Sequence, residues 1–78
     1  KLLARIAAHP NTARFEEVTR LLRAFGFRLS RIRGSHHIYV HPSVPELVNV
    51  QDVRGEAKAY QVRQFLRIVE RYDLPLKE

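Results

Sequence analysis

Cysteine, methionine and tryptophan are absent from this chain, and glycine occurs only three times. Without cysteine the chain can form neither a disulfide framework nor a thiolate metal site, and nothing in it indicates an oxidising compartment. Its apolar runs are only a few residues long, too short to cross a membrane or to form the apolar core of a signal peptide. We therefore expect a cytoplasmic protein with no membrane partner.

Acidic residues are missing from a long central stretch of the chain. No Asp or Glu lies between Val18 and Pro45, but the stretch contains five arginines: Arg20, Arg23, Arg28, Arg31 and Arg33. The chain carries a net charge of +6, and most of its 14 basic side chains are arginine, whose planar guanidinium group binds phosphate in a bidentate manner. This pattern favours an anionic partner, namely nucleic acid, an acidic protein or a membrane surface. The alternative is a solvated basic face that only aids solubility.

The length and composition predict one globular domain over residues 1–78. Hydrophobic residues make up 45% of the chain and charged residues 28%, and the apolar residues recur with regular spacing. The first ten residues predict a short helix that covers one edge of the core and ends before Pro10. A stronger helical pattern begins at Phe15, and Gly26 is its expected left-handed C-cap.

After Gly26 the spacing of apolar residues changes to every second residue. Residues 27–33, 36–41 and 46–51 are typical of three strands, with Gly34 and Ser35 between the first two. Pro42 and Pro45 are expected to flank the second loop, because proline cannot continue a strand ladder. The text from Ala59 onward predicts a last helix that ends before Pro75. The order indicates an α+β domain, with a three-stranded antiparallel sheet, helices on one of its faces and an extra N-terminal helix.

Two adjacent histidines follow Gly34 and Ser35 at the start of the second predicted strand. His37 and His41 are four residues apart, which suits a zinc site on a helix, but on a strand this spacing separates them by ~13 Å. Since adjacent strand residues point to opposite faces, His36 and His37 do not converge on one ion, and the segment offers no acid or cysteine as a further ligand. We therefore expect no metal and no cofactor.

Strand alternation also separates the two histidines by role. With Ile38 and Val40 facing the core, His36 is expected on their side of the sheet, half-buried beside the turn and rigidly held. The open face then carries three surface contacts: His37, Tyr39 and His41.

Three interpretations of this stretch stay open on the residues alone. A histidine in a strand is more often structural than catalytic. General acid–base catalysis on RNA is the second interpretation, because arginines favour the neutral imidazole and RNA supplies its own 2′-OH nucleophile. Here Gly34 would let the backbone approach a phosphate closely and Ser35 would donate a hydrogen bond to it. The third is an RNA-binding module of the double-stranded-RNA-binding type that does not cleave.

The text "FEEVTRLLRAFGFRLSRIRGSHHIYVHP", followed by an apolar strand and a helix entered at a lysine, resembles HicA-type toxins, the mRNA interferases of toxin–antitoxin pairs. The likeness extends from about Phe15 to Tyr72. It rests on Gly26-Phe27, on Gly34-Ser35-His36 and on Arg63-Gln64-Phe65-Leu66. The resemblance implies a fold like the double-stranded-RNA-binding domain over residues 14–73, with residues 1–10 as an N-terminal helical extension.

The resemblance further implies a metal-independent endoribonuclease that cleaves mRNA and is neutralised by a HicB-type antitoxin protein. The catalytic histidine of the family follows Gly-Ser, which carries over to His36, with His37 as the second choice. The sequence "NVQDVRGEAKAYQ" departs from the family pattern because it lacks the second histidine of many relatives, which leaves Arg54 or Lys58 to stabilise phosphate. The expected RNA contacts are Gly34, Ser35, Arg28, Arg31, Arg33, Tyr39, His41, Arg54 and Lys58.

Overall fold

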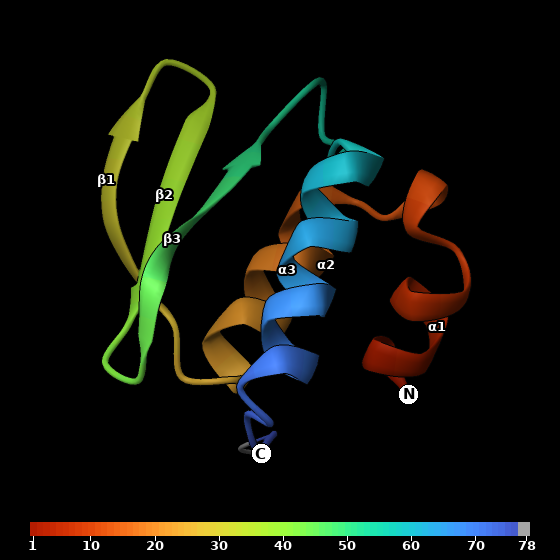
Figure 1. Cartoon of the computed structure of the whole chain (residues 1–78). Helices are drawn as coiled ribbons and strands as arrows, with labels where there is room; N and C mark the ends of the chain where they lie inside the picture. Colours follow the sequence, from red (N-terminus) through yellow and green to blue (C-terminus); the bar gives the residue numbers. More distant parts are fainter. Residues whose placement is uncertain (77–78) are drawn as a thin grey trace.

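The computed structural model describes residues 1–76 and places a three-stranded sheet beside three α-helices (Figure 1). In chain order its elements are α1 (Leu2–Ala8), a 3-10 turn (Pro10–Thr12), α2 (Phe15–Ala24), β1 (Arg28–Arg33), β2 (His36–His41), β3 (Val44–Gln51) and α3 (Ala59–Arg71). The predicted α+β fold is confirmed, including the α-β-β-β-α order after the first helix. All three helices lie on the same side of the sheet, which leaves its other face open (Figure 1).

The sheet is antiparallel with the strand order β1-β2-β3, so β1 and β3 are its two edges. β3 begins at Val44, two residues before the predicted start, and it includes Pro45. The expectation that Pro45 lies outside the strand is therefore wrong. An edge strand tolerates proline because only one side of it takes part in the ladder, and the pairing of β2 with β3 is irregular between Tyr39 and His41.

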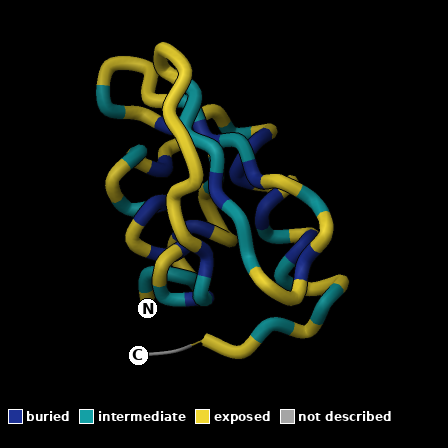
Figure 2. Tube along the Cα trace, turned by 90° about the vertical axis from the view of Figure 1, so that its left-hand side faces the viewer, coloured by how far each residue is buried: buried dark blue, intermediate teal, exposed yellow. Residues whose placement is uncertain are grey.

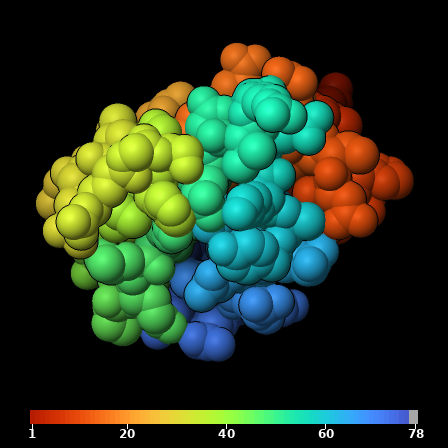
Figure 3. Space-filling model, turned by 90° about the horizontal axis from the view of Figure 1, so that it is seen from above, coloured from red at the N-terminus to blue at the C-terminus, as the bar shows by residue number. Residues whose placement is uncertain are grey.

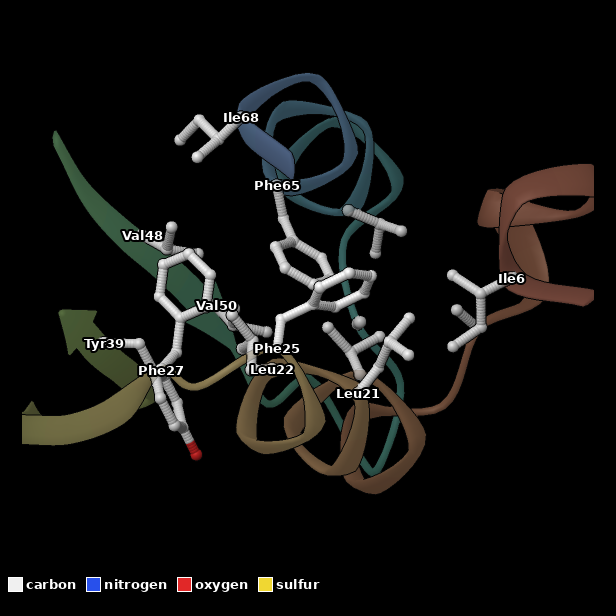
Figure 4. Packing of buried hydrophobic residues seen from close by; sticks show 14 of the residues in the cluster. Ile6, Leu21, Leu22, Phe25, Phe27, Tyr39, Val48, Val50, Phe65 and Ile68 are labelled. Carbon is white, nitrogen blue, oxygen red and sulfur yellow. The ribbon is translucent and has the colours of Figure 1, made fainter. Parts of the chain in front are cut away.

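The core lies between the sheet and the helices (Figure 4). Phe65 of α3 is its centre, because the rings of Phe25 and Phe27 both meet the Phe65 ring edge-on, with centroids 6.0 and 5.8 Å away. Ile6 of α1 is 1% exposed and closes the side of the core that the sheet does not reach. The predicted role of the first helix is thus confirmed.

The two long helices both end in a Schellman motif. At the end of α2, Gly26 has a φ of 94°, and the N–H groups of Gly26 and Phe27 donate to the carbonyls of Arg23 and Leu22. This confirms Gly26 as the left-handed C-cap. At the end of α3 the same position is held by Asp73, a residue that pays a steric cost for its φ of 49°.

The predicted facing of β2 is wrong. Tyr39 is only 3% exposed and pairs with the buried Val48, so the faces are exchanged relative to the expectation. The helix-facing side of β2 carries His37, Tyr39 and His41, and the open side carries His36, Ile38 and Val40. The physical reason is area: burying the large ring of Tyr39 removes more apolar surface from water than burying Ile38 or Val40.

A bulge in β1 decides where its arginines point. Leu29 pairs with Tyr39 and Arg31 pairs with Ile38, so Ser30 is an extra residue without its own partner on β2. Strict alternation would place Arg28 on the opposite face from Arg31. With the bulge, all three arginines of the strand lie on the open face of the sheet: Arg28, Arg31 and Arg33.

Candidate functional site at the hairpin end

The turn between β1 and β2 and the loop between β3 and α3 meet at one end of the molecule, which we call the hairpin end (residues 33–37 and 52–58). Gly34 has a φ of 59° at the first turn position, as a type II′ turn requires, and a side chain added to it would meet nothing within 4 Å. Seen from above, the hairpin lies next to the 52–58 loop (Figure 3). Gly34 and Ser35 are both exposed there, so they are open to a ligand.

The Ser35 carbonyl joins these two segments and orients His37. It accepts hydrogen bonds from the Asp52 N–H at 3.0 Å and from Nδ1 of His37 at 3.1 Å. A carbonyl oxygen can only accept, so Nδ1 must carry the proton in the neutral ring. The Nε2 atom of His37 then holds the free lone pair, and it makes no hydrogen bond within residues 1–76.

The His37 ring is also held by packing. It meets the ring of Phe15 edge-on at a centroid distance of 4.6 Å. Phe15 is the first residue of α2, and its N–H donates to the Gly55 carbonyl at 2.9 Å. The Ala57 N–H donates to the Ala13 carbonyl at 3.1 Å, so the 52–58 loop is bound to the start of α2 by two backbone hydrogen bonds. The half-buried His37 therefore sits between the hairpin, the start of α2 and the 52–58 loop.

A buried glutamine anchors the loop to the helix. Gln61 is 2% exposed, and its Oε1 accepts the N–H of Gln51 at 2.8 Å while its Nε2 donates to Oε1 of Gln51 at 2.9 Å. Gln51 precedes Asp52, whose N–H reaches the Ser35 carbonyl. Gln61 was not among the residues predicted from the sequence. Its position four residues before Phe65, on the apolar face of the last helix, is the signal that could have revealed it.

His36 belongs to a different environment, on the open face. Its Nδ1 lies 3.1 Å from Oδ1 of Asn49 on β3, and its cross-strand neighbour on β1 is Arg33. Arg31 lies next along the same face, opposite Ile38. The structure thus brings His36, Arg31 and Arg33 together, whereas Arg28 lies at the other end of β1, opposite Val40.

Tyr39 and His41, two predicted RNA contacts, lie on the helix-facing side of β2, where Tyr39 is buried and His41 is half-buried. Tyr39 is part of the core and presents no ring face on which a base could stack. His41 uses both ring nitrogens within the protein, since Nδ1 accepts the Ser43 N–H at 3.0 Å and Nε2 therefore donates to the Phe25 carbonyl at 3.1 Å. Its ring also packs on Phe27, with centroids 4.9 Å apart. The prediction that these two side chains lie on the open surface is wrong, for the reason given above for β2.

Arg54 and Lys58 lie on the 52–58 loop. Arg54 and Gly55 both have positive φ, at 54° and 85°, and they form the tip of a tight turn closed by paired backbone hydrogen bonds between Val53 and Glu56. Lys58 is exposed and immediately precedes α3. Since Asp52 ties this loop to Ser35, both cations come from a segment that is fixed to the hairpin.

Within residues 1–76, no group of three or more His, Asp or Glu side chains lies close enough together to hold a metal ion. Nor does any helix in this part of the chain have the length and apolar character needed to cross a membrane.

Comparison with known proteins adds one match. The family model described as the HicA toxin of bacterial toxin-antitoxin matches residues 15–70. This range starts at the first residue of α2 and ends one residue before the end of α3, so it includes the hairpin end and omits α1. No curated protein and no solved structure matches the chain.

Proposed function

We propose that this chain, which belongs to the HicA toxin family of bacterial toxin–antitoxin systems, is an endoribonuclease that cleaves mRNA without a metal ion. The observation that carries the proposal is the free Nε2 of a histidine whose other nitrogen is committed to the Ser35 carbonyl. A ring held in this way presents a proton acceptor in one direction only. Its substrate would be met in the cytoplasm, where we expect the chain to act.

Cleavage of RNA by its own 2′-OH group requires only a few functional groups from the enzyme. A base removes the proton from a 2′-OH group, the 2′ oxygen attacks the adjacent phosphorus, and the 5′ oxygen of the next nucleotide leaves and takes a proton from the solvent. Cations that stabilise the charge on the phosphate lower the barrier further. One histidine and a few cations at the hairpin end are sufficient for this chemistry.

We assign the base to His37 and keep His36 as the alternative. The sequence favours His36 on two grounds: the resemblance places the catalytic histidine directly after Gly-Ser, and strand alternation predicts a half-buried ring on the core side. In the folded protein both rings are half-buried, but it is His37 that lies on the helix side, against Phe15, with its Nδ1 donating to a main-chain carbonyl. His36 lies on the open face, and its partner is an amide side chain, whose oxygen and nitrogen positions can be exchanged by rotation.

Cations on both sides of the hairpin complete the proposed site. Lys58 and Arg54 approach from the loop that is tied to Ser35, and they stabilise the reacting phosphate. Arg31 and Arg33 bind neighbouring phosphates on the open face. An RNA strand that crosses the exposed Gly34-Ser35 turn can contact both groups. Arg28 would bind RNA farther along the same face.

The test is cleavage of labelled single-stranded RNA by the purified protein, with and without a chelator. We expect cleavage in both conditions, and we expect His37→Ala to lower the rate by ~10²–10⁴-fold while RNA binding is retained. His36→Ala is the matched control and should change the rate by less than about tenfold. Loss of activity in His36→Ala alone would return the assignment to His36, and loss with chelator would refute the metal-free mechanism.

The rival function is an RNA-binding module that does not cleave. It gives salt-sensitive RNA binding without turnover in the same assay. Wild-type protein that binds RNA and leaves it intact, under conditions where the fold is shown to be intact, would favour this alternative.

A further inference from the structure

β1 is the most exposed regular element of the protein. All six of its residues are exposed, and as the first strand in the order β1-β2-β3 it has no neighbouring strand on its outer side within residues 1–76. Figure 2 shows this strand running down the face of the molecule with little cover. Its outward N–H and C=O groups are therefore available to a further strand.

The two faces of β1 differ sharply in character. The open face carries Arg28, Arg31 and Arg33, and the bulge at Ser30 is what aligns them. The other face carries Leu29 and Ile32, which are 43% and 54% exposed because the helices do not extend under this edge of the sheet. β3, the opposite edge, buries Val44, Val48 and Val50 and does not share this pattern.

These features together select one kind of occupant. A second copy of the chain is disfavoured, because edge-to-edge pairing of two β1 strands would bring arginines against arginines. RNA would use the arginines but neither the backbone edge nor the apolar side chains. A protein segment in extended conformation uses all three, provided that its side chains are acidic on one face and apolar on the other.

We propose that β1 takes up an extended acidic segment of the antitoxin as a fourth strand of the sheet. Acidic side chains of that segment lie opposite Arg28, Arg31 and Arg33, and apolar ones cover Leu29 and Ile32. The partner follows from the toxin–antitoxin family of the chain. The inhibitory consequence rests on the proposed function: the added strand occupies the arginines that bind RNA on the open face, beside the hairpin end.

Amide hydrogen exchange of the toxin, alone and in complex with the antitoxin encoded with it, tests the proposal directly. We expect the outward amides of residues 28–33 to exchange at least about tenfold more slowly in the complex, as strand addition requires. Outward amides of β3 are expected to be unchanged and serve as the internal control. A complex in which β1 gains no protection, or the absence of any complex, would overturn the proposal.

A pair of matched variants tests the side-chain part. Leu29→Glu places a negative charge on the apolar face of β1 and should weaken antitoxin binding by about tenfold or more. Leu47→Glu is the control, since Leu47 is exposed at 54% on the other edge strand, and its effect should stay below about threefold. Equal weakening by both variants would show that binding is not centred on β1.

The outcome is independent of catalysis. Neither measurement uses RNA, so a toxin that proves inactive but shows the protected β1 would refute only the ribonuclease. In a parallel arm, a short single-stranded RNA should bind without slowing the outward β1 amides. Protection of these amides by RNA to the same degree as by the antitoxin would contradict strand addition.

Discussion

A histidine lies near each end of β2, and the two differ in how their ring nitrogens are hydrogen-bonded. At the hairpin end, His37 commits Nδ1 to the Ser35 carbonyl and keeps Nε2 free. At the other end, which we call the far end (residues 41–46, the end of α2 and residues 71–74), His41 commits both nitrogens. A histidine with one free nitrogen can move a proton, whereas one with two internal partners holds the fold together.

The far end is rich in such internal partners. Glu46 of β3 accepts hydrogen bonds from the Tyr72 hydroxyl and the Arg71 guanidinium, both at 2.7 Å, and both long helices end there in Schellman motifs. The hairpin end instead has an exposed turn and three exposed cations, Arg33, Arg54 and Lys58, and the Nε2 atom of His37 makes no hydrogen bond within residues 1–76. This difference between the two ends predicts that substitutions at the far end lower the stability of the fold. Substitutions at the hairpin end are expected to lower activity.

His41→Ala should give the largest stability effect at the far end. It removes the ring that packs on Phe27 and leaves the Phe25 carbonyl and the Ser43 N–H without their partner. We expect a loss of about 2–3 kcal/mol in the free energy of unfolding, measured by urea denaturation. RNA cleavage per folded molecule should be unchanged. A loss of activity without a loss of stability would show that His41, like His37, takes part in cleavage.

Gln61 of α3 lies outside the hairpin end but supports it from behind, and Gln61→Leu tests that support. The substitution leaves the Gln51 N–H without its acceptor, which should cost about 1–3 kcal/mol of stability. It also loosens the segment that carries the Asp52 N–H to the Ser35 carbonyl, so we expect the neutral His37 ring to shift from the Nδ1–H form toward the Nε2–H form in nitrogen NMR spectra.

Gln64→Leu, three residues along the same helix and exposed, is the control for Gln61. It should alter neither stability nor the His37 ring. An unchanged ring in Gln61→Leu, with stability lowered, would mean that this glutamine only holds α3 to β3.

Glu46→Gln tests the far end through pH. The hydrogen bond from Tyr72, supported by Arg71, lowers the pKa of Glu46 below its usual value of 4.5. Between the lowered folded value and 4.5 the unfolded state binds more protons, so this group stabilises the fold above pH 4.5 and its contribution is lost as pH falls through the folded pKa. The variant should therefore lose less stability on acidification than the parent protein does.

Thermal melts between neutral and acid pH measure this difference. Glu16→Gln serves as the control, because Glu16 is exposed and forms no ion pair within residues 1–76. If the melting temperatures of the parent protein and of Glu46→Gln fall in parallel as the pH is lowered, Glu46 does not contribute to the acid sensitivity of the fold.

Asp73→Gly should give the smallest effect, and one of opposite sign. Asp73 holds the left-handed position of the Schellman motif that ends α3, and glycine adopts this conformation without steric cost. We expect a gain of about 0.5–1 kcal/mol, read from the urea midpoint. Gly26→Ala at the corresponding position of α2 should destabilise the protein instead, and a neutral result at both positions would exclude a conformational origin.

Much of the fold could be predicted because its signals are local. Helical spacing from Phe15, Gly26 as a C-cap and the Gly34-Ser35 turn each act within a few residues, and each is found in the structure. The extent of β3 was predicted less well, since Pro45 is tolerated only because β3 is an edge strand. No local pattern reveals which strand is at an edge.

The sequence by itself determined the element order, the acid-free arginine stretch and the presence of two histidines after Gly-Ser. Only the tertiary structure decided which way β2 faces. Strand alternation requires neighbouring side chains of β2 to point to opposite faces, but it does not decide which set is buried. The burial of Tyr39 in the core selects the set that also contains His37 and His41, so it is His37 that is held against Phe15. The bulge at Ser30 likewise depends on strand pairing, and it alone aligns Arg28 with Arg31 and Arg33. The facing of β2 depends on contacts between residues far apart in the chain, such as Phe15 and His37, and the bulge depends on the pairing register of β1 with β2, which the spacing of apolar residues does not specify.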